Sequence, residues 1–230
     1  MRAVTLLLFA VSLLLAQDGQ EEFVPGKTRA LRWRDLEKVI KSARKNYKPV
    51  LIYVYSKDHL ELCKQIEKIL AESPVRLATS KFLCIKIDGD DKDTWDFRKD
   101  IGLKKEDAGL FLCDCLFRIR ERYQGRTSLD DPKEFARHLK EFDKEHKKFV
   151  KKLKVLDKVW EKAEWARKKR RWRDYYGLLE EVKKLAANVE GDKRGEQAQQ
   201  EIENALKEGN RILNEAEKLV QQVERSLRWG

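Results

Sequence analysis

The chain has 230 residues, of which 40% are charged and 41% hydrophobic, and its formal net charge is +11. That length accommodates one large domain or two small ones. Eleven Gly and four Pro are too few for a collagen-like or a Pro/Gly-rich disordered protein. Nine Phe, six Trp and six Tyr are enough for a packed core. The composition therefore indicates a basic, globular protein.

Residues 1–16 have the layout of a secretory signal peptide. A short basic start, Met1-Arg2, precedes an uncharged apolar run over residues 3–16, and acidic residues follow at once. The run is shorter than the roughly 20 residues that cross a membrane. We therefore expect an exported protein, periplasmic or extracellular, with no transmembrane segment after the signal. The alternative is a buried core helix, and the bulky Leu14 leaves the cleavage position open.

Residues 17–27 are polar, with Gly and Pro, which indicates a flexible lead-in. Residues 28–145 then alternate helix and strand patterns. Helices are predicted at 33–46, 58–72, 94–99 and from 131, and strands at 50–55, 82–87, 110–115 and 116–123. The continuous, β-branched run at 50–55 is typical of a strand buried on both faces. Asp58 and Glu61 have the spacing of a capping box. The order predicts an α/β sheet, first parallel and then antiparallel, with an edge strand last.

The segment 31–144 resembles the thioredoxin-like family. In that family a buried strand ends in a turn that carries Trp-Cys-x-x-Cys, and a helix follows. Here His59 stands at the Trp position, Leu60 replaces the first, nucleophilic Cys, and Cys63 keeps the second. Ala108 stands where the family places a cis-proline. The resemblance implies a thioredoxin-like sheet flanked by helices, without the two hallmarks of the family's chemistry.

Disulfide exchange needs an exposed thiolate that attacks and a second thiol that releases the mixed disulfide. A low-pKa Cys at a helix N-terminus supplies the first, and Leu60 cannot. We therefore predict a redox-inactive binding or scaffold module of the cell envelope. The alternative is an enzyme, a single-cysteine thiol oxidoreductase in which His59 or Lys64 helps to form the thiolate of Cys63.

The other cysteines are Cys84, Cys113 and Cys115. The last two are two residues apart on a predicted strand, so they should share one face. Small buried side chains are one interpretation, and a Cys-x-Cys redox pair or half of a thiolate metal site is another. Zinc needs further ligands, and the sequence has no Cys-x-x-Cys or paired His. We therefore expect no metal and no cofactor, and the spacing leaves any disulfide pairing open.

Strand patterns end near residue 146, and residues 146–230 predict a basic all-α region with a helical hairpin and a long helix. The pattern of Ala163, Ala166, Trp172 and Tyr175 resembles one degenerate tetratricopeptide-type hairpin. A plain three-helix appendage or a coiled coil is the alternative, because such repeats usually occur in arrays. The C-terminal helices also make an oligomer possible through pairing between chains.

The positive charge is concentrated in residues 144–173, which hold 14 basic and 4 acidic residues. The densest part, interleaved with tryptophans, consists of Lys168, Lys169, Arg170, Arg171 and Arg173. Behind a signal peptide, we expect these five residues to bind an anionic membrane surface, an envelope polymer or an acidic protein rather than nucleic acid. A solvated helix face is the alternative interpretation.

Overall fold

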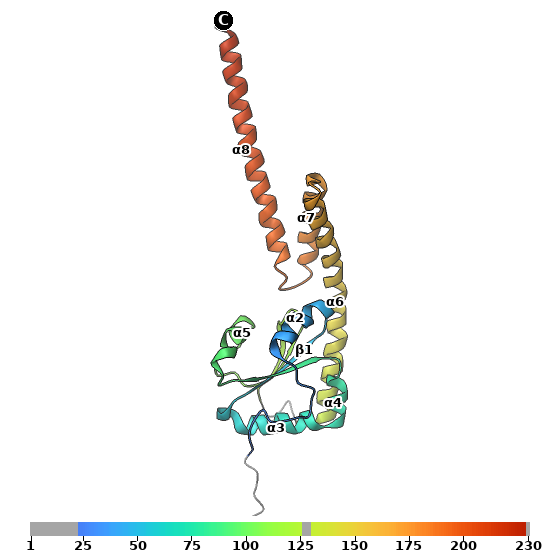
Figure 1. Cartoon of the computed structure of the whole chain (residues 1–230). Helices are drawn as coiled ribbons and strands as arrows, with labels where there is room; N and C mark the ends of the chain where they lie inside the picture. Colours follow the sequence, from blue (N-terminus) through green and yellow to red (C-terminus); the bar gives the residue numbers. More distant parts are fainter. Residues whose placement is uncertain (1–22, 126–129, 229–230) are drawn as a thin grey trace, which may run out of the picture.

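The computed structural model describes residues 23–125 and 130–228, and the predicted signal peptide lies outside them. An α/β region and a helical region are joined by one long helix, α6 (Figure 1). The helices are α2 (Leu36–Asn46), α3 (Leu60–Ala71), α4 (Ser73–Thr79), α5 (Trp95–Asp100), α6 (Pro132–Lys168), α7 (Trp172–Ala186) and α8 (Arg194–Arg228), with single 3-10 turns at Lys57–His59 and Lys92–Thr94. The strands are β1 (Val50–Tyr55), β2 (Leu83–Asp88), β3 (Gly109–Cys113) and β4 (Ile119–Tyr123).

The four strands form one mixed sheet in the order β2-β1-β3-β4. β1 pairs in parallel with β2, with Val50 opposite Leu83, and antiparallel with β3, with Val50 opposite Cys113. β4 pairs antiparallel with β3 and forms an edge of the sheet. The prediction of a parallel pair followed by an antiparallel hairpin is confirmed.

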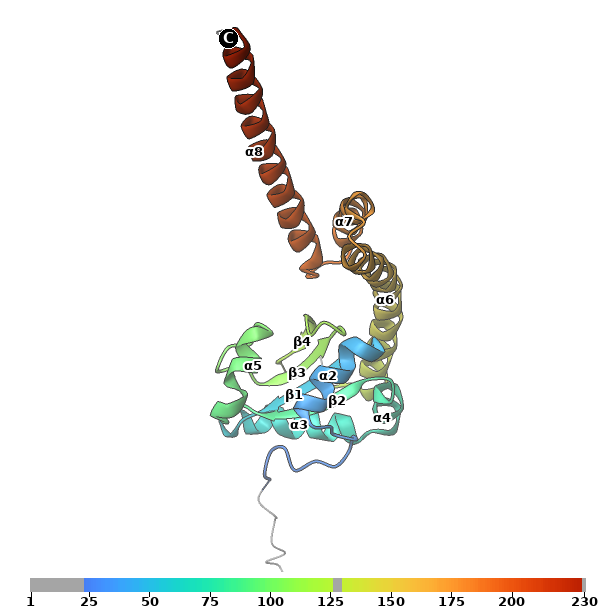
Figure 2. The same cartoon turned by 45° about the horizontal axis from the view of Figure 1, so that its top comes forward.

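Helices cover both faces of this sheet (Figure 2). Leu51 and Tyr53 of β1 pack into a core with α3, α4 and the first half of α6. Val50, Ile52 and Val54 point to the other face and pack with α2, and Phe97 of α5 lies against this second core. These five of the six β1 side chains are fully buried, because the strand lies between two neighbouring strands and two helical layers. The predicted strand with two buried faces is confirmed.

Pro74 lies in the first turn of a helix, α4. The sequence pattern places Pro74 beyond the end of the helix that follows β1, and α3 does end at Ala71. A second helix, α4, starts at once with Pro74 in its first turn. Proline is tolerated there because the first turn of a helix does not use its missing N–H. The sequence pattern does not predict α4.

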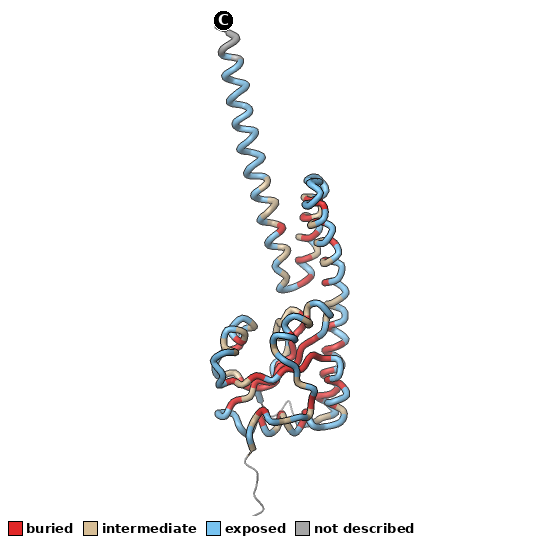
Figure 3. The backbone as a smooth tube through the Cα atoms, viewed as in Figure 1, coloured by how far each residue is buried: buried red, intermediate tan, exposed pale blue. Residues whose placement is uncertain are grey.

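The C-terminal region is a hairpin of α6 and α7, and the first part of α8 packs against it (Figure 3). Its core is separate from those of the sheet and includes Leu156 of α6, Leu179 of α7 and Ala198 of α8. Helix α6 continues without a break through residues 145 and 146, where the domain boundary is predicted. The two regions therefore share one helix.

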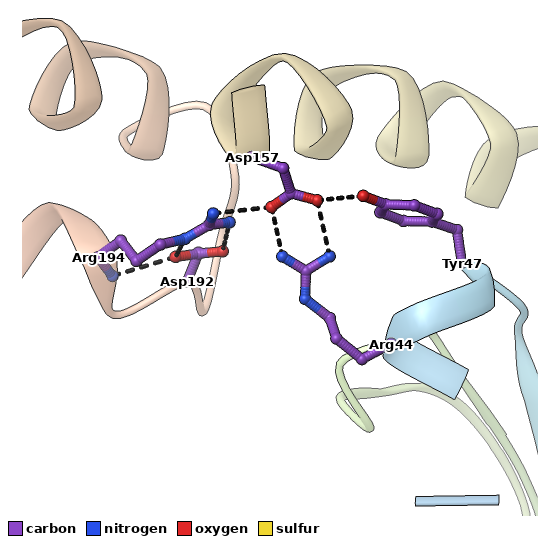
Figure 4. A network of polar contacts seen from close by, with 5 residues as sticks. All are labelled: Arg44, Tyr47, Asp157, Asp192 and Arg194. Atoms are coloured by element: carbon purple, nitrogen blue, oxygen red, sulfur yellow. Dashed lines mark hydrogen bonds and ion pairs between the residues drawn. The ribbon is translucent and has the colours of Figure 1, made fainter. Parts of the chain in front are cut away.

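A cluster of charged side chains ties α2 to the helical region (Figure 4). Asp157 of α6 accepts hydrogen bonds from both terminal nitrogens of Arg44, at 3.0 and 2.5 Å, and from the Tyr47 hydroxyl. It also pairs at 2.7 Å with Arg194, which Asp192 holds at 2.6 Å. Burial alone would raise the pKa of the Asp157 carboxyl, but the hydrogen bonds from Arg44, Tyr47 and Arg194 hold it below its ordinary value. We call these five residues the junction cluster.

Candidate functional site

The turn between β1 and α3 carries the residues that the thioredoxin resemblance singles out. Its 3-10 turn is capped by Ser56, which accepts a hydrogen bond from the Asp58 amide at 3.2 Å. The predicted capping box of Asp58 and Glu61 is wrong, because Ser56 takes the capping position one turn before α3 begins. Asp90, in the loop after β2, accepts hydrogen bonds from the Ser56 hydroxyl at 3.2 Å and from the Lys57 backbone amide at 3.3 Å. The acidic turn of Asp88, Asp90, Asp91 and Asp93 is predicted to be solvated, but the Asp90 carboxylate holds the turn after β1 against the sheet.

Leu60 and Cys63 are the residues that the resemblance places at the two cysteine positions of the thioredoxin-like family. Leu60 is the first residue of α3 and is 40% exposed. Cys63 lies one helical turn further along and has no exposed surface. Its thiol donates to the backbone carbonyl of Ser56 at 3.7 Å, whereas His59 lies exposed on the turn. The acceptor of the Cys63 thiol is therefore a backbone oxygen rather than the imidazole of His59.

The described part of the lead-in contacts α3 through Phe23, which lies under Lys64, and through Gly26. The Gly26 amide donates to Glu67 at 2.7 Å, and the Tyr53 hydroxyl donates to the same carboxylate oxygen at 3.0 Å. Gly26 has a φ of +78°, and a Cβ there would meet the Tyr55 ring at 2.5 Å. The predicted lead-in at 17–27 begins outside the described residues, and its described part makes these contacts. A weak signal was available, since Gly26 follows a proline in a short polar segment.

All four cysteines are free and buried. Burial raises the pKa of Cys84 and of Cys115 to about 12, and it also raises the pKa of Cys113. Strand β3 ends at Cys113, which packs in a core of the sheet, whereas Cys115 lies beyond the strand and packs in the helical core. The prediction that Cys113 and Cys115 share one strand face is wrong because the strand ends earlier than the pattern indicates.

Over residues 23–125 and 130–228, no group of three or more His, Cys, Asp or Glu side chains is placed to hold a metal ion. In the same ranges, no helix combines the length and the apolar character that a membrane crossing requires. Of the histidines, His59 is exposed, while His146 is buried with its Nε2 atom 3.2 Å from the Tyr47 carbonyl oxygen.

The five basic residues predicted to bind an anionic partner lie at the tip of the α6–α7 hairpin (Figure 1). Lys168 ends α6, Arg173 is the second residue of α7, and the other three form the turn between them. The turn is tight: Arg170 has a φ of +56°, and the Arg171 amide donates to the Ala166 carbonyl at 3.0 Å. All five are exposed. We call these residues, Lys168, Lys169, Arg170, Arg171 and Arg173, the basic tip.

Two tryptophans flank the basic tip, and Trp165 and Trp172 are each 51% exposed. Arg171 lies over the Trp165 ring, 5.4 Å from its centroid, and pairs with Asp174 at 2.6 Å. In the part of the chain that the structure describes, no carboxylate lies within ion-pairing distance of the other four cations. The helical spacing of Trp172, Tyr175, Tyr176, Leu179, Val182 and Ala186 predicts one packed apolar stripe that includes Trp172. It is instead half-exposed, because it is the first residue of α7 and projects at the hairpin's end.

No protein-family model and no curated protein matches this chain. Several solved structures are similar to about half of it. A DsbH oxidoreductase shares 11% identity over 50% of this chain and 88% of its own, with a TM-score of 0.37. A thioredoxin from Thermus thermophilus shares 16% over 49% and 86%, with a TM-score of 0.38. The reduced C-terminal domain of DsbD from Neisseria meningitidis shares 22% over 45% and 92%, with a TM-score of 0.36. At this level of similarity, the likenesses indicate neither a substrate nor a partner.

The strand order β2-β1-β3-β4 and the helix that follows β1 define the fold class of the region before α6. The fold is α/β, a thioredoxin-like sheet flanked by helices, and an all-α region follows it. The predicted fold class is confirmed. In the turn after β1, Leu60 is exposed at the head of α3 and Cys63 is buried one helical turn further along.

Proposed function

We propose that this chain is an exported, redox-inactive thioredoxin-like protein that acts as a binding or scaffold module in the cell envelope. The observation that carries the proposal is that leucine replaces the outer cysteine at the head of α3. The exposed outer position is Leu60, and the remaining thiol, Cys63, has no exposed surface. Dithiol exchange begins with attack by an exposed thiolate, and this turn offers none.

The same observation weighs against a single-cysteine oxidoreductase. Reactive cysteines lie in partly exposed, electropositive surroundings. Cys63 is enclosed in the core between β1 and α3, and its hydrogen-bond acceptor is a backbone carbonyl. His59 and Lys64, either of which is expected to help form the thiolate of such an enzyme, are both exposed.

Alkylation of the native protein at neutral pH tests this part of the proposal. Cys63 should react no faster than Cys84, which is buried in the sheet, and all four thiols should react once the protein is unfolded. Leu60→Cys provides a positive control, because it adds a thiol at the exposed head of α3. Rapid, selective modification of Cys63 that Cys63→Ser abolishes would favour the single-cysteine enzyme. Turnover in an insulin-type disulfide reduction assay would do so as well.

We assign binding of an anionic partner, an envelope surface or an acidic protein, to the basic tip. Its five cations share one exposed turn, and the half-exposed rings of Trp165 and Trp172 lie beside them. Attraction of this kind acts within a Debye length of about 8 Å at physiological salt and weakens as salt is added. The α6–α7 hairpin, interpreted as one degenerate tetratricopeptide-type unit, serves as the support that projects the tip.

Retention of the protein on anionic vesicles and on an anionic polymer, at low and at high salt, tests this assignment. Replacing the five cations of the basic tip by Gln should abolish retention at low salt. A matched control removes the same charge from the exposed side of α6 and should retain most of the binding; it replaces Lys144, Lys148, Lys151, Lys152 and Lys158 by Gln. Equal losses in both variants would show that net charge, rather than the tip, drives binding.

Export is tested by cell fractionation. The protein should accumulate in the envelope fraction with an N-terminus shortened by about 16 residues or slightly more, as a signal peptide predicts. An intact N-terminus on cytoplasmic protein would contradict the proposal.

A further inference from the structure

Beyond its first turns, α8 extends away from the rest of the molecule (Figures 1 and 3). One of its faces is apolar. Ala198 is buried against α7, and Ile202 is partly buried there. Every residue from Leu206 to Val223 is exposed. The large apolar side chains in this stretch, each 54–62% exposed, are Leu206, Ile212, Leu213, Leu219, Val220 and Val223.

The apolar face repeats every seven residues. One row contains Leu206, Leu213 and Val220, a second contains Ile212 and Leu219, and a central row contains Ile202, Gly209, Ala216 and Val223. A straight helix with 3.6 residues per turn drifts by about 20° per heptad, so a strict seven-residue repeat fits a left-handed coiled coil. The repeat spans three heptads, the length at which such a pattern indicates a coiled coil. The face therefore suits a second helix that carries the same repeat.

The central row also favours a close neighbour. Glycine in the middle of a helix lowers its stability. A Cβ at Gly209 would meet nothing within 4 Å, so packing within this chain does not require glycine there. Small residues at Gly209 and Ala216, one heptad apart, would let the backbone of another helix approach closely.

Acidic residues flank the apolar face, and contacts within the same chain hold them. Arg211 pairs with Glu208 and with Glu215, each at 2.6 Å. Glu201 accepts a hydrogen bond from the Tyr175 hydroxyl. Because Arg211 offsets part of the charge of Glu208 and Glu215 on the same helix, these flanks do not demand a partner with basic flanks, and an identical helix can face them.

We propose that α8 pairs with α8 of a second copy of this chain as an antiparallel coiled coil over residues 206–226. A second copy supplies the same heptad repeat. The antiparallel direction follows from α7, which covers α8 near Ala198 and Ile202. In a parallel pair, the first turns of the partner's α8 would occupy the space that α7 fills. In an antiparallel pair, the C-terminal end of the partner's α8 lies at this place instead and can stop beside α7. The overlap is about 30 Å long, with Ala216 near its centre and Gly209 of one helix near Val223 of the other. The pairing is independent of the proposed function.

Sedimentation equilibrium of the purified protein, from low to high micromolar concentration, measures the pairing. The protein should have twice the mass of one chain. Replacing Leu213, Leu219 and Val220 by Ser should weaken dimerisation by at least about 100-fold, because three buried apolar side chains are lost. A matched control places Ser at Lys207, Asn214 and Gln221, on the opposite face, and should remain dimeric. A monomer at every concentration, or equal weakening in both variants, would overturn the proposal.

Disulfide cross-linking measures the direction. The native thiols are buried, so a single introduced cysteine reports alone. Ala216→Cys should form a disulfide-linked dimer on oxidation, because this position lies near its counterpart at the centre of an antiparallel pair. Leu206→Cys should not, because the two copies of this residue lie at opposite ends. Efficient cross-linking through Leu206→Cys would show a parallel pair and overturn the antiparallel assignment.

Discussion

Replacing Asp157 by Asn should loosen the helical region from the sheet. The Asp157 side chain is 15% exposed and accepts hydrogen bonds from Arg44 and Tyr47 on one side and pairs with Arg194 on the other. Asn has nearly the same volume but no charge and only one acceptor oxygen. Arg44 would lose its two-point contact, while Arg194 would keep Asp192.

The size of the effect follows from these contacts. A hydrogen bond to a charged group contributes about 1.5–3 kcal/mol to stability. The Arg44 side chain is 36% exposed, so water replaces part of what it loses. We therefore expect the free energy of unfolding to fall by about 2–3 kcal/mol. That is less than the roughly 3–5 kcal/mol for breaking a fully buried pair.

The pH dependence has a definite sign. The folded protein holds the pKa of Asp157 below its ordinary value of about 3.9, which the unfolded chain has. The stabilisation is then present above about pH 4 and is lost as the pH falls through the folded-state pKa. The difference between the wild type and Asp157→Asn should stay constant from roughly pH 5 to 8 and shrink at lower pH.

Urea unfolding, followed by circular dichroism and by tryptophan fluorescence, measures both effects. Glu180→Gln is the control, because Glu180 forms an exposed pair with Lys183 at 3.1 Å and should change stability by less than about 0.5 kcal/mol. A free energy of unfolding for Asp157→Asn equal to that of this control would contradict the prediction. So would a stability difference that changes between roughly pH 5 and 7, where the carboxyl of Asp157 does not titrate.

Two further substitutions test the packing around the candidate site by the same urea assay. Gly26→Ala should cost at least about 2 kcal/mol, because its positive φ and the Tyr55 ring both oppose a side chain, whereas Gly102→Ala, with a similar φ and open space, should cost about 1 kcal/mol. Equal costs would mean that the ring moves freely. Arg98→Met should cost about 3 kcal/mol, since the buried guanidinium donates to four backbone carbonyls, at 2.6 to 3.2 Å, in the loops that flank α5. Lys99→Met, at an exposed neighbouring residue, is its control. A similarly small change in the free energy of unfolding for both variants would contradict the anchoring role of Arg98.

The sequence alone determined the central features of the α/β region. A strand with two buried faces has a continuous β-branched run, and Val50–Tyr55 is such a run at the centre of the sheet. The loss of the outer cysteine is also visible in the sequence, because Leu60 stands between the strand and Cys63. These properties are local, since side-chain chemistry and spacing within one element decide which faces are buried and which groups can react.

The sequence pattern did less well where an element's neighbours decide the outcome. By sequence, Pro74 fits equally well just after the end of one helix or in the first turn of the next. The close packing of α4 on α6 favours the first turn of a new helix. Cys115 has the spacing of a strand residue, but the chain turns after Cys113 and carries it into the helical core.

Only the tertiary structure showed the junction cluster and the uncovered face of α8. Asp157 is one of four acidic residues in a strongly basic segment, and its partners Arg44 and Arg194 lie far away in the sequence. Periodicity reports that a side chain belongs to an apolar or polar face, but it does not say which element that face meets. The heptad rows of α8 are visible in the sequence, whereas their exposure from Leu206 onward follows from α7 being too short to cover them. Contacts between distant segments depend on the path of the whole chain, and local patterns carry no information about that path.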